Sequence, residues 1–162
     1  MSVNVSYNAA VTVQEVLEAN PYSSPATQRT VTHTLFNSQK NLNGSSTPPV
    51  TKVAAFKAAL VAGAKTLDLT ALPGTNGVTV DGTGLKVQVL KVKNLGANAL
   101  SIVPGASGGS DLLAADMKIV LAQNQEVMIF GNDATPDVGP TDKTLDLAGT
   151  LVQESEWMIV LG

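Results

Sequence analysis

The sequence has no cysteine and one histidine among its 162 residues. The missing cysteine excludes disulfide frameworks, thiolate zinc sites and cysteine nucleophiles. Aromatic residues make up 4% of the chain, too few for the stacking platforms that bind single-stranded nucleic acids. No apolar run approaches the ~20 residues that span a bilayer. Residues 1–10 also lack the basic and apolar parts of a secretory signal, so we expect no membrane partner.

Charge is scarce as well, because charged residues make up 14% of the chain and the formal net charge is −3. Nucleic-acid affinity comes mainly from Lys and Arg side chains that neutralise phosphates, so we expect no nucleic-acid partner. Hydrophobic residues reach 44%, which argues against intrinsic disorder. The composition therefore predicts a soluble, folded protein with much uncharged surface, and such surface often marks protein contacts.

The amino-acid composition of the sequence changes near residue 47. Residues 1–46 are polar and rich in Asn, Ser and Thr, and residues 47–162 hold most of the aliphatic content. We predict an N-terminal arm or subdomain over 1–46 and a compact body over 47–162. Within the arm, residues 12–15 fit a capping box, and Pro21 would end a helix, so at most one short helix is expected there.

Short segments that alternate apolar and polar residues recur through the body between Gly- and Pro-rich turns. A change of phase at Val89 and Leu90 indicates a β-bulge. Closely spaced short strands with regular turns predict a mainly β protein, an antiparallel β-sandwich or jelly roll. The expected strands are 65–70, 85–93, 100–103, 117–121, 126–130 and 156–161.

Residues 51–62 fit two structures. Their alanines favour a helix that Gly63 could cap. As a strand, the segment places Ala54, Phe56, Ala58 and Leu60 on one face, and residues 61–64 turn it into a hairpin with the next strand. We favour the strand, because the hairpin would bring two apolar faces into register.

A pentapeptide occurs twice in the body. The sequence KTLDL stands at residues 65–69 and again at residues 143–147. The repeat predicts two similar strands in one sandwich, with Asp68 and Asp146 directed to solvent between inward leucines.

No catalytic group is expected. His33 stands alone, and a triad needs a nucleophile and an orienting acid close to the histidine. No Gly-x-Ser-x-Gly motif is present. Glu154 and Glu156 share one face of a strand, whereas the carboxylates of a glycosidase flank their substrate, so a solvated strand is favoured. We therefore predict no catalytic, cofactor-binding or metal-binding residues, and we predict that the chain is not an enzyme.

One loop, 132–142, carries enough oxygen ligands to suggest calcium. It lacks EF-hand spacing, and Pro136 and Pro140 restrict its backbone. We favour a turn in which Asn and Asp side chains bond their own backbone, with a calcium site as the alternative. The oxygen-bearing residues in question are Asn132, Asp133, Asp137 and Asp142.

Two glycine-rich stretches do not predict a nucleotide cofactor. Residues 105–110 lack the Lys-Ser/Thr end of a phosphate loop, and residues 82–84 lack the third glycine of a dinucleotide fingerprint. Trp157 lies in a terminal apolar strand and is predicted to be in the core. Three lysines could form a basic stripe without the aromatics that nucleic acid would need: Lys86, Lys91 and Lys93.

Five segments of the body resemble small virion-associated head proteins of tailed phages. They are LDLTALPGTNG at 67–77, GLKVQ at 84–88, KNLGAN at 93–98, IVPGA at 102–106 and the terminal VLG at 160–162. The resemblance covers roughly residues 50–162 and leaves the arm unplaced.

This resemblance implies a capsid decoration (cement) protein with a β-sandwich fold, made in the host cytoplasm and located on the capsid surface of the virion. The implied partners are the major capsid protein and further copies of the chain, as a dimer or trimer. We expect contacts through the arm and through the turns at 73–77 and 133–140. The alternatives are a carbohydrate-binding sandwich, a hydrolase that uses His33 with Asp137 or Glu156, and a self-assembling coat or tail component.

Overall fold

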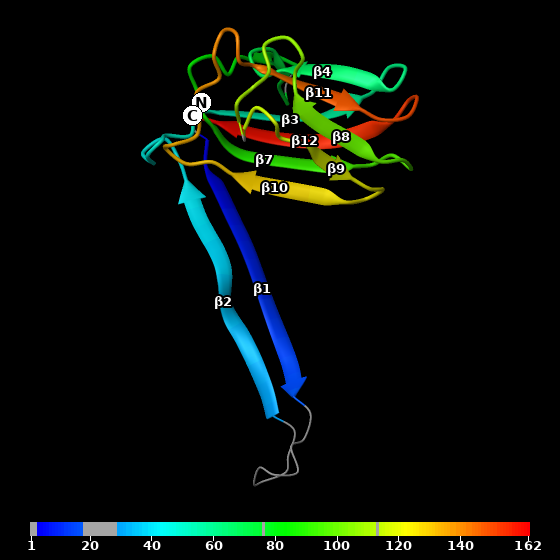
Figure 1. The fold of residues 1–162 in the computed structure, drawn as a ribbon. Helices are drawn as coiled ribbons and strands as arrows, with labels where there is room; N and C mark the ends of the chain where they lie inside the picture. The colour runs from blue at the N-terminus through cyan, green and yellow to red at the C-terminus, as the bar shows by residue number, and fades with distance from the viewer. Residues whose placement is uncertain (1–2, 18–28, 76, 113) are drawn as a thin grey trace. The chain divides into compact units, whose positions relative to one another are not determined.

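The computed structural model describes residues 3–17, 29–75, 77–112 and 114–162 (Figure 1). The described chain is all β and contains no helix, which confirms the predicted mainly β class. It divides into two compact units, a hairpin unit Asn4–Leu42 and a body formed by Asn43–Gly162 together with Val3.

The hairpin unit consists of two long strands. β1 (Val5–Leu17) and β2 (Arg29–Leu42) pair antiparallel from one end to the other. A strand of 13 residues is about 43 Å long at roughly 3.3 Å per residue. The predicted helix at residues 12–15 is wrong, because this segment lies inside β1 and its backbone pairs with β2. A long ladder of strand hydrogen bonds here outweighs a local capping pattern. Pro21 lies outside the described residues.

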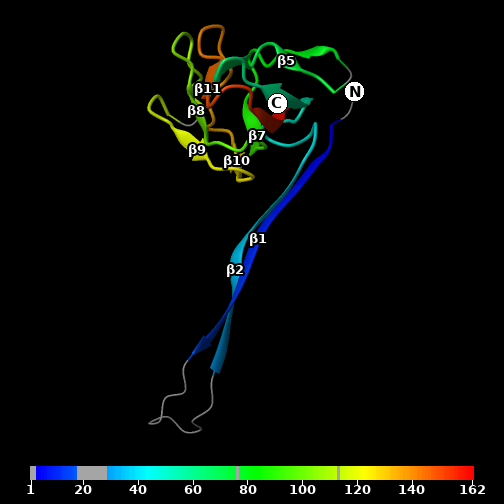
Figure 2. The ribbon, with the colours of Figure 1, turned by 90° about the vertical axis from the view of Figure 1, so that its right-hand side faces the viewer.

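The body contains two four-stranded antiparallel sheets, which Figure 2 shows as separate layers. We call them the first and the second sheet. The first sheet has the order β10 (Glu126–Phe130), β7 (Val87–Asn94), β12 (Glu154–Leu161), β3 (Lys52–Ala59). The second sheet has the order β4 (Ala64–Asp68), β11 (Thr144–Ala148), β8 (Leu100–Pro104), β9 (Ile119–Leu121). A small ribbon joins β5 (Leu72–Pro73) to β6 (Thr79–Val80).

The strand pairs of the two sheets are nested along the chain. β8 pairs with β9, β7 pairs with β10, β4 pairs with β11, and β3 pairs with β12. Each pair encloses the preceding one in the sequence, so the body is one long antiparallel ribbon folded into two layers. The first and last strands of the body therefore lie side by side.

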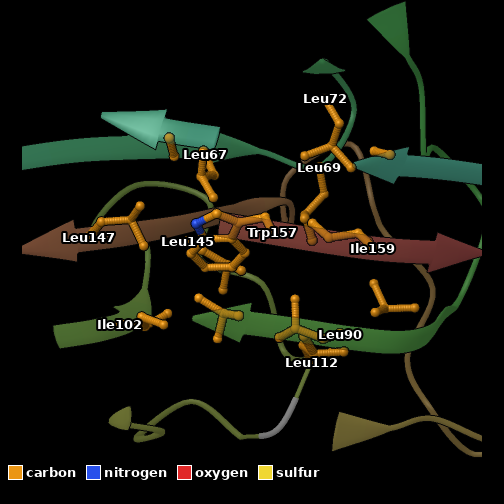
Figure 3. Packing of buried hydrophobic residues seen from close by; sticks show 14 of the residues in the cluster. Leu67, Leu69, Leu72, Leu90, Ile102, Leu112, Leu145, Leu147, Trp157 and Ile159 are labelled. Atoms are coloured by element: carbon orange, nitrogen blue, oxygen red, sulfur yellow. The ribbon is translucent and has the colours of Figure 1, made fainter. Parts of the chain in front are cut away.

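The core lies between the two sheets and includes Trp157, which is 1% exposed. Its indole Nε1–H donates to Ser155 Oγ at 2.8 Å, and its ring stacks on Phe56 with centroids 6.4 Å apart. Figure 3 shows Leu145 and Leu147 of the second sheet close to Trp157. The prediction that Trp157 belongs to the core is confirmed.

The segment 51–62 contains strand β3, as favoured, but its predicted hairpin partner is wrong. Ala54, Ala58 and Leu60 are buried, and Phe56 packs against the core. β3 pairs with β12, whereas the next strand, β4, pairs with β11 in the other sheet. A single bridge between residues 61 and 64 remains of the expected hairpin.

The turn after β3 carries the chain from one sheet to the other. Ala62 and Gly63 have φ angles of 50° and 83°. The backbone of Gly63 is bonded to the loop after β11, because its N–H donates to Leu151 O and its carbonyl accepts from Gly149 N–H. A Cβ on Gly63 would lie 2.8 Å from Gly149 O. This close approach explains the glycine and why the turn leaves the first sheet.

The predicted bulge occurs in β7, at a slightly earlier position. The pairing of β7 with β12 shifts where Val160 faces Val89 and Leu161 faces Val87, which leaves Gln88 as the extra residue. Val89 pairs with Val160, so its side chain lies on the outer face of the sheet.

The repeated pentapeptide forms two adjacent strands. β4 and β11 pair with Leu145 opposite Leu67. The Asp68 carboxylate lies 2.9 Å from Lys143 Nζ, and Asp146 accepts hydrogen bonds from Thr66 Oγ1 and Ala106 N–H. The two similar strands therefore share one sheet, and both aspartates are held by hydrogen bonds.

Replacement of Trp157 tests the core. We expect Trp157→Ala to lower the free energy of unfolding by about 3–5 kcal/mol, because it leaves a large cavity between the sheets. Met158→Ala on the same strand is the control, since Met158 is 46% exposed and should cost less than about 1 kcal/mol. Urea unfolding measures both values, and equal losses would contradict the assigned face of β12.

Acid should weaken the pairing of β4 with β11. Burial alone raises the pKa of Asp68, but hydrogen bonds from Thr70 and Lys143 together bring it below its ordinary value of 3.8. A carboxylate whose pKa is lowered in the folded state stabilises the protein above about pH 4. This stabilisation is lost as the pH falls through the pKa of the folded state. Asp68→Asn should therefore cost less than about 1 kcal/mol at pH 7 and less still at pH 3. Urea unfolding at both pH values measures this, and an equal loss at both would contradict it.

Candidate interaction surfaces

The predicted acidic loop forms a turn. Asn132 Oδ1 accepts from Ala134 N–H at 2.9 Å, and Thr135 Oγ1 accepts from Asn132 N–H at 2.8 Å. Asp137 pairs with Lys86 at 2.9 Å. In the described part of the chain, no group of three or more His, Cys, Asp or Glu residues is placed to hold a metal ion. The favoured turn is thus confirmed, and the calcium alternative finds no cluster here.

The other residues singled out in the sequence do not converge. The backbone of His33 lies in β2 opposite Val13, and its side chain is outside the described part. Glu154 and Glu156 are exposed on β12, as predicted. Lys91 and Lys93 lie on β7 among glutamates, so the lysines form no basic stripe. The burial of Trp157 also removes the exposed aromatic that a carbohydrate-binding sandwich would use.

One end of the body carries no charged residue. We call it the uncharged end, formed by loops 60–63, 95–99, 122–125 and 149–153. Val61, Leu151 and Val152 are 77%, 73% and 80% exposed there. Hydrogen bonds join the turn at Gly63 to the loop after β11, so these apolar side chains stand on neighbouring loops. In soluble proteins, large apolar side chains gathered on an exposed surface often mark a protein contact.

The uncharged end is organised by one buried amide, that of Asn94, which is 0% exposed. Its Nδ2 donates to Asn98 O at 2.8 Å and to Leu121 O at 2.9 Å. Its Oδ1 accepts from Gly96 N–H and from Gln153 Nε2, each at 2.9 Å. Asn94 thereby ties two of the four loops, 95–99 and 149–153, to the end of β9. A side chain amide with all its hydrogen-bonding capacity used gives the end a defined shape.

The other end of the body is acidic. It contains the predicted contact turns 73–77 and 133–140, and its loops 43–51, 69–86, 105–118 and 131–143 carry six Asp against three Lys. Asp81 accepts from Thr83 Oγ1 at 2.6 Å and from Thr83 N–H at 2.9 Å, and these hydrogen bonds lower its pKa. The six carboxylates are Asp81, Asp111, Asp116, Asp133, Asp137 and Asp142.

The outer face of the first sheet presents side chains in rows that cross its four strands. We call the first the charged row; it contains Glu126, Lys93, Glu156 and Lys57. The next is the methionine row, with Met128, Lys91, Met158 and Ala55. A shallow depression lies between these two rows. Met128 and Met158 are 42% and 46% exposed.

No protein family, curated protein or solved structure matches the chain. Within the described residues, no helix is long and apolar enough to cross a membrane. The hairpin unit, the uncharged end and the outer face of the first sheet are therefore the features from which a function can be argued.

The role of Asn94 can be measured. We expect Asn94→Ala to lower the free energy of unfolding by about 3 kcal/mol, because it leaves buried donors and acceptors without partners. Asn98→Ala is the matched control, since Asn98 contributes its backbone carbonyl and its side chain is exposed. Thermal or urea unfolding compares the two variants. Similar losses for both would show that the amide of Asn94 does not organise these loops.

Proposed function

We propose that the chain is a virion structural protein of a tailed phage, a capsid decoration (cement) protein that binds and stabilises the assembled lattice of the major capsid protein. The resemblance of residues 50–162 to phage head proteins supplies the biological setting. The hairpin and the apolar loops supply the surfaces.

The hairpin unit is the single observation that carries this proposal. Its two strands have 13 and 14 residues, and neither pairs with a third strand in the described chain. No described residue of the hydrophobic core cluster comes from Asn4–Leu42. An isolated two-stranded hairpin is marginally stable in water. A hairpin of this length therefore gains most of its stability when a neighbouring protein covers a face or adds a strand to an edge.

The body is suited to repeated contacts in a shell. Its nested strand pairs support the finer assignment of the sandwich as a jelly roll, an arrangement that occurs in viral capsid domains and also in lectins. The uncharged end offers Val61, Leu151 and Val152 to an apolar surface of the lattice. The ion pair between Lys86 and Asp137 and the hydrogen bond between Asn132 and Thr135 hold the acidic loop in one shape. The loop is thus available for a further contact.

The proposed mechanism is mechanical. Each copy binds a site that exists only where neighbouring capsid subunits have assembled, so binding stabilises the assembled state by RT ln(1 + [L]/Kd) per site. Many such sites on one shell multiply a modest contact energy. The chain needs no catalytic group for this role.

Removal of the hairpin tests the proposal. We expect the full chain to co-sediment with assembled shells of the phage's major capsid protein and to raise their melting temperature. Deletion of Asn4–Leu42 should weaken this binding at least about tenfold, because the proposed lattice contact is lost. The body should still unfold cooperatively, since its described core comes from residues 54–161. Equal binding by the shortened protein, or no binding by the full chain, would overturn the proposal.

The apolar loops are tested by a separate variant. Val61→Ser, Leu151→Ser and Val152→Ser together should weaken shell binding by about tenfold or more and change the unfolding temperature little, because these side chains are exposed. Val120→Ser is the matched control, since Val120 is 54% exposed in the middle of β9. If the triple variant binds shells as well as the control does, the uncharged end is not part of the contact.

A further inference from the structure

The charged row alternates in sign across the first sheet. Glu126 pairs in register with Lys93, Lys93 with Glu156, and Glu156 with Lys57. The order of the strands, β10-β7-β12-β3, therefore gives the order negative, positive, negative, positive. When a second copy of this row is placed against it in the opposite order, every charge faces a charge of opposite sign. A row of one sign lacks this property.

Most charges of this row form no ion pair with the residues that the structure describes. In the described part of the chain, Lys57, Lys93 and Glu156 form no ion pair, and Glu126 pairs with Lys91 of the methionine row at 3.3 Å. The second sheet differs, because the carboxylates on its outer face are held internally. There Asp68 pairs with Lys143, and Asp146 accepts hydrogen bonds from within the body. The outer face of the first sheet thus keeps charges available for a partner.

We propose that a second copy of this chain docks on the outer face of the first sheet, with a two-fold axis parallel to the strands and between β7 and β12. A two-fold axis makes each contact occur twice, as in most homodimers. Rotation about this axis reverses the order of the charged row. Glu126 then faces Lys57 of the second copy, and Lys93 faces Glu156 of the second copy.

The methionine row fits the same arrangement. The rotation sets Met158 against the aliphatic stem of Lys91 of the second copy and sets Met128 against Ala55 of the second copy. Methionine is enriched at protein interfaces, and both methionines are nearly half exposed. The strands of the two copies would run nearly parallel, as in aligned sheet packing about 10 Å apart.

The charges also decide between the possible axes. A two-fold axis that runs along the charged row, across the strands, would set each residue of this row against itself. Glu126 would then face Glu126 and Lys93 would face Lys93, and such like-charge contacts oppose binding. Of the two axes aligned with the sheet, only the one parallel to the strands pairs opposite charges.

The size of the face sets the expected affinity. Four strands about 4.8 Å apart and roughly five residues long cover about 320 Å² per copy. A standard stable interface buries about 800 Å² per partner. The dimer should therefore be weak, and its population should depend on protein concentration and on salt.

Charge reversal tests the pairing in the full chain without any capsid protein. Sedimentation velocity over a roughly hundredfold range of concentration should show a monomer–dimer equilibrium. Lys93→Glu should raise the dimer Kd at least about tenfold, because it creates two like-charge contacts per dimer. The double variant Lys93→Glu with Glu156→Lys should return Kd to within about threefold of the wild-type value. Lys118→Glu, an exposed position outside this face, changes the net charge equally and should leave Kd unchanged.

A cross-link tests the same face by position. The chain has no cysteine, so Met158→Cys supplies a single thiol on the outer face of the first sheet. A short bis-maleimide should join two such chains. Val120→Cys, equally exposed on the second sheet, should give no dimer above background. If a Lys93 variant fails to fold, Lys57→Glu and the double variant Lys57→Glu with Glu126→Lys test the same charge pairing.

Several results would overturn the proposal. They are a monomer at every concentration, an unchanged Kd in Lys93→Glu, no rescue by the charge swap, or an equal effect of Lys118→Glu. Because this pairing is measured without shells, its failure leaves the decoration proposal standing. Conversely, a dimer that binds no shell would contradict the proposed function and not the pairing.

Discussion

Burial of Trp157 and its neighbours between the two sheets is the interaction on which the body depends. Strands that are far apart in the sequence meet only because their apolar faces share this core, and β3 and β12 are paired along their whole length although they begin and end the body. With no disulfide available, the nested ladder and the core must hold the first and last strands of the body together. The outer faces and loops are then free to carry contacts.

The chain uses its few charges in two ways. Asp146 on the second sheet and Asp81 and Asp137 in the acidic loops interact with nearby donors. On the first sheet they are set out in an alternating row, and at the uncharged end they are absent. This distribution of charge is compatible with the proposed role as a subunit of an assembly.

The sequence predicted the elements of the body well because alternation records burial directly. Trp157, Leu67 and Leu145 lie in the core as their patterns indicate, and the β-bulge appears at Gln88, close to the phase change. Pairing was harder to predict. The turn at Gly63 reads as a hairpin locally, and only its bonds to Gly149 and Leu151 show why the chain crosses to the second sheet.

The surfaces were only partly visible in the sequence. The acidic turn could be predicted from Asn132 and its prolines, but the charged row could not, because it depends on the register of four strands far apart in the chain. The hairpin was missed because a capping pattern at residues 12–15 suggested a helix, and long-range pairing outweighs that local signal. Residues 29–42, which pair with β1, are the part of the sequence that could have indicated the hairpin.

Hydrogen exchange of the backbone amides in β1 and β2, compared between the free protein and the protein bound to assembled shells, tests the account most directly. If the hairpin gains its stability from neighbouring subunits, its amides should exchange rapidly in the free protein and become protected at least about tenfold on the shell, while those of β12 change little. Equal exchange of the hairpin amides in both states would contradict the account.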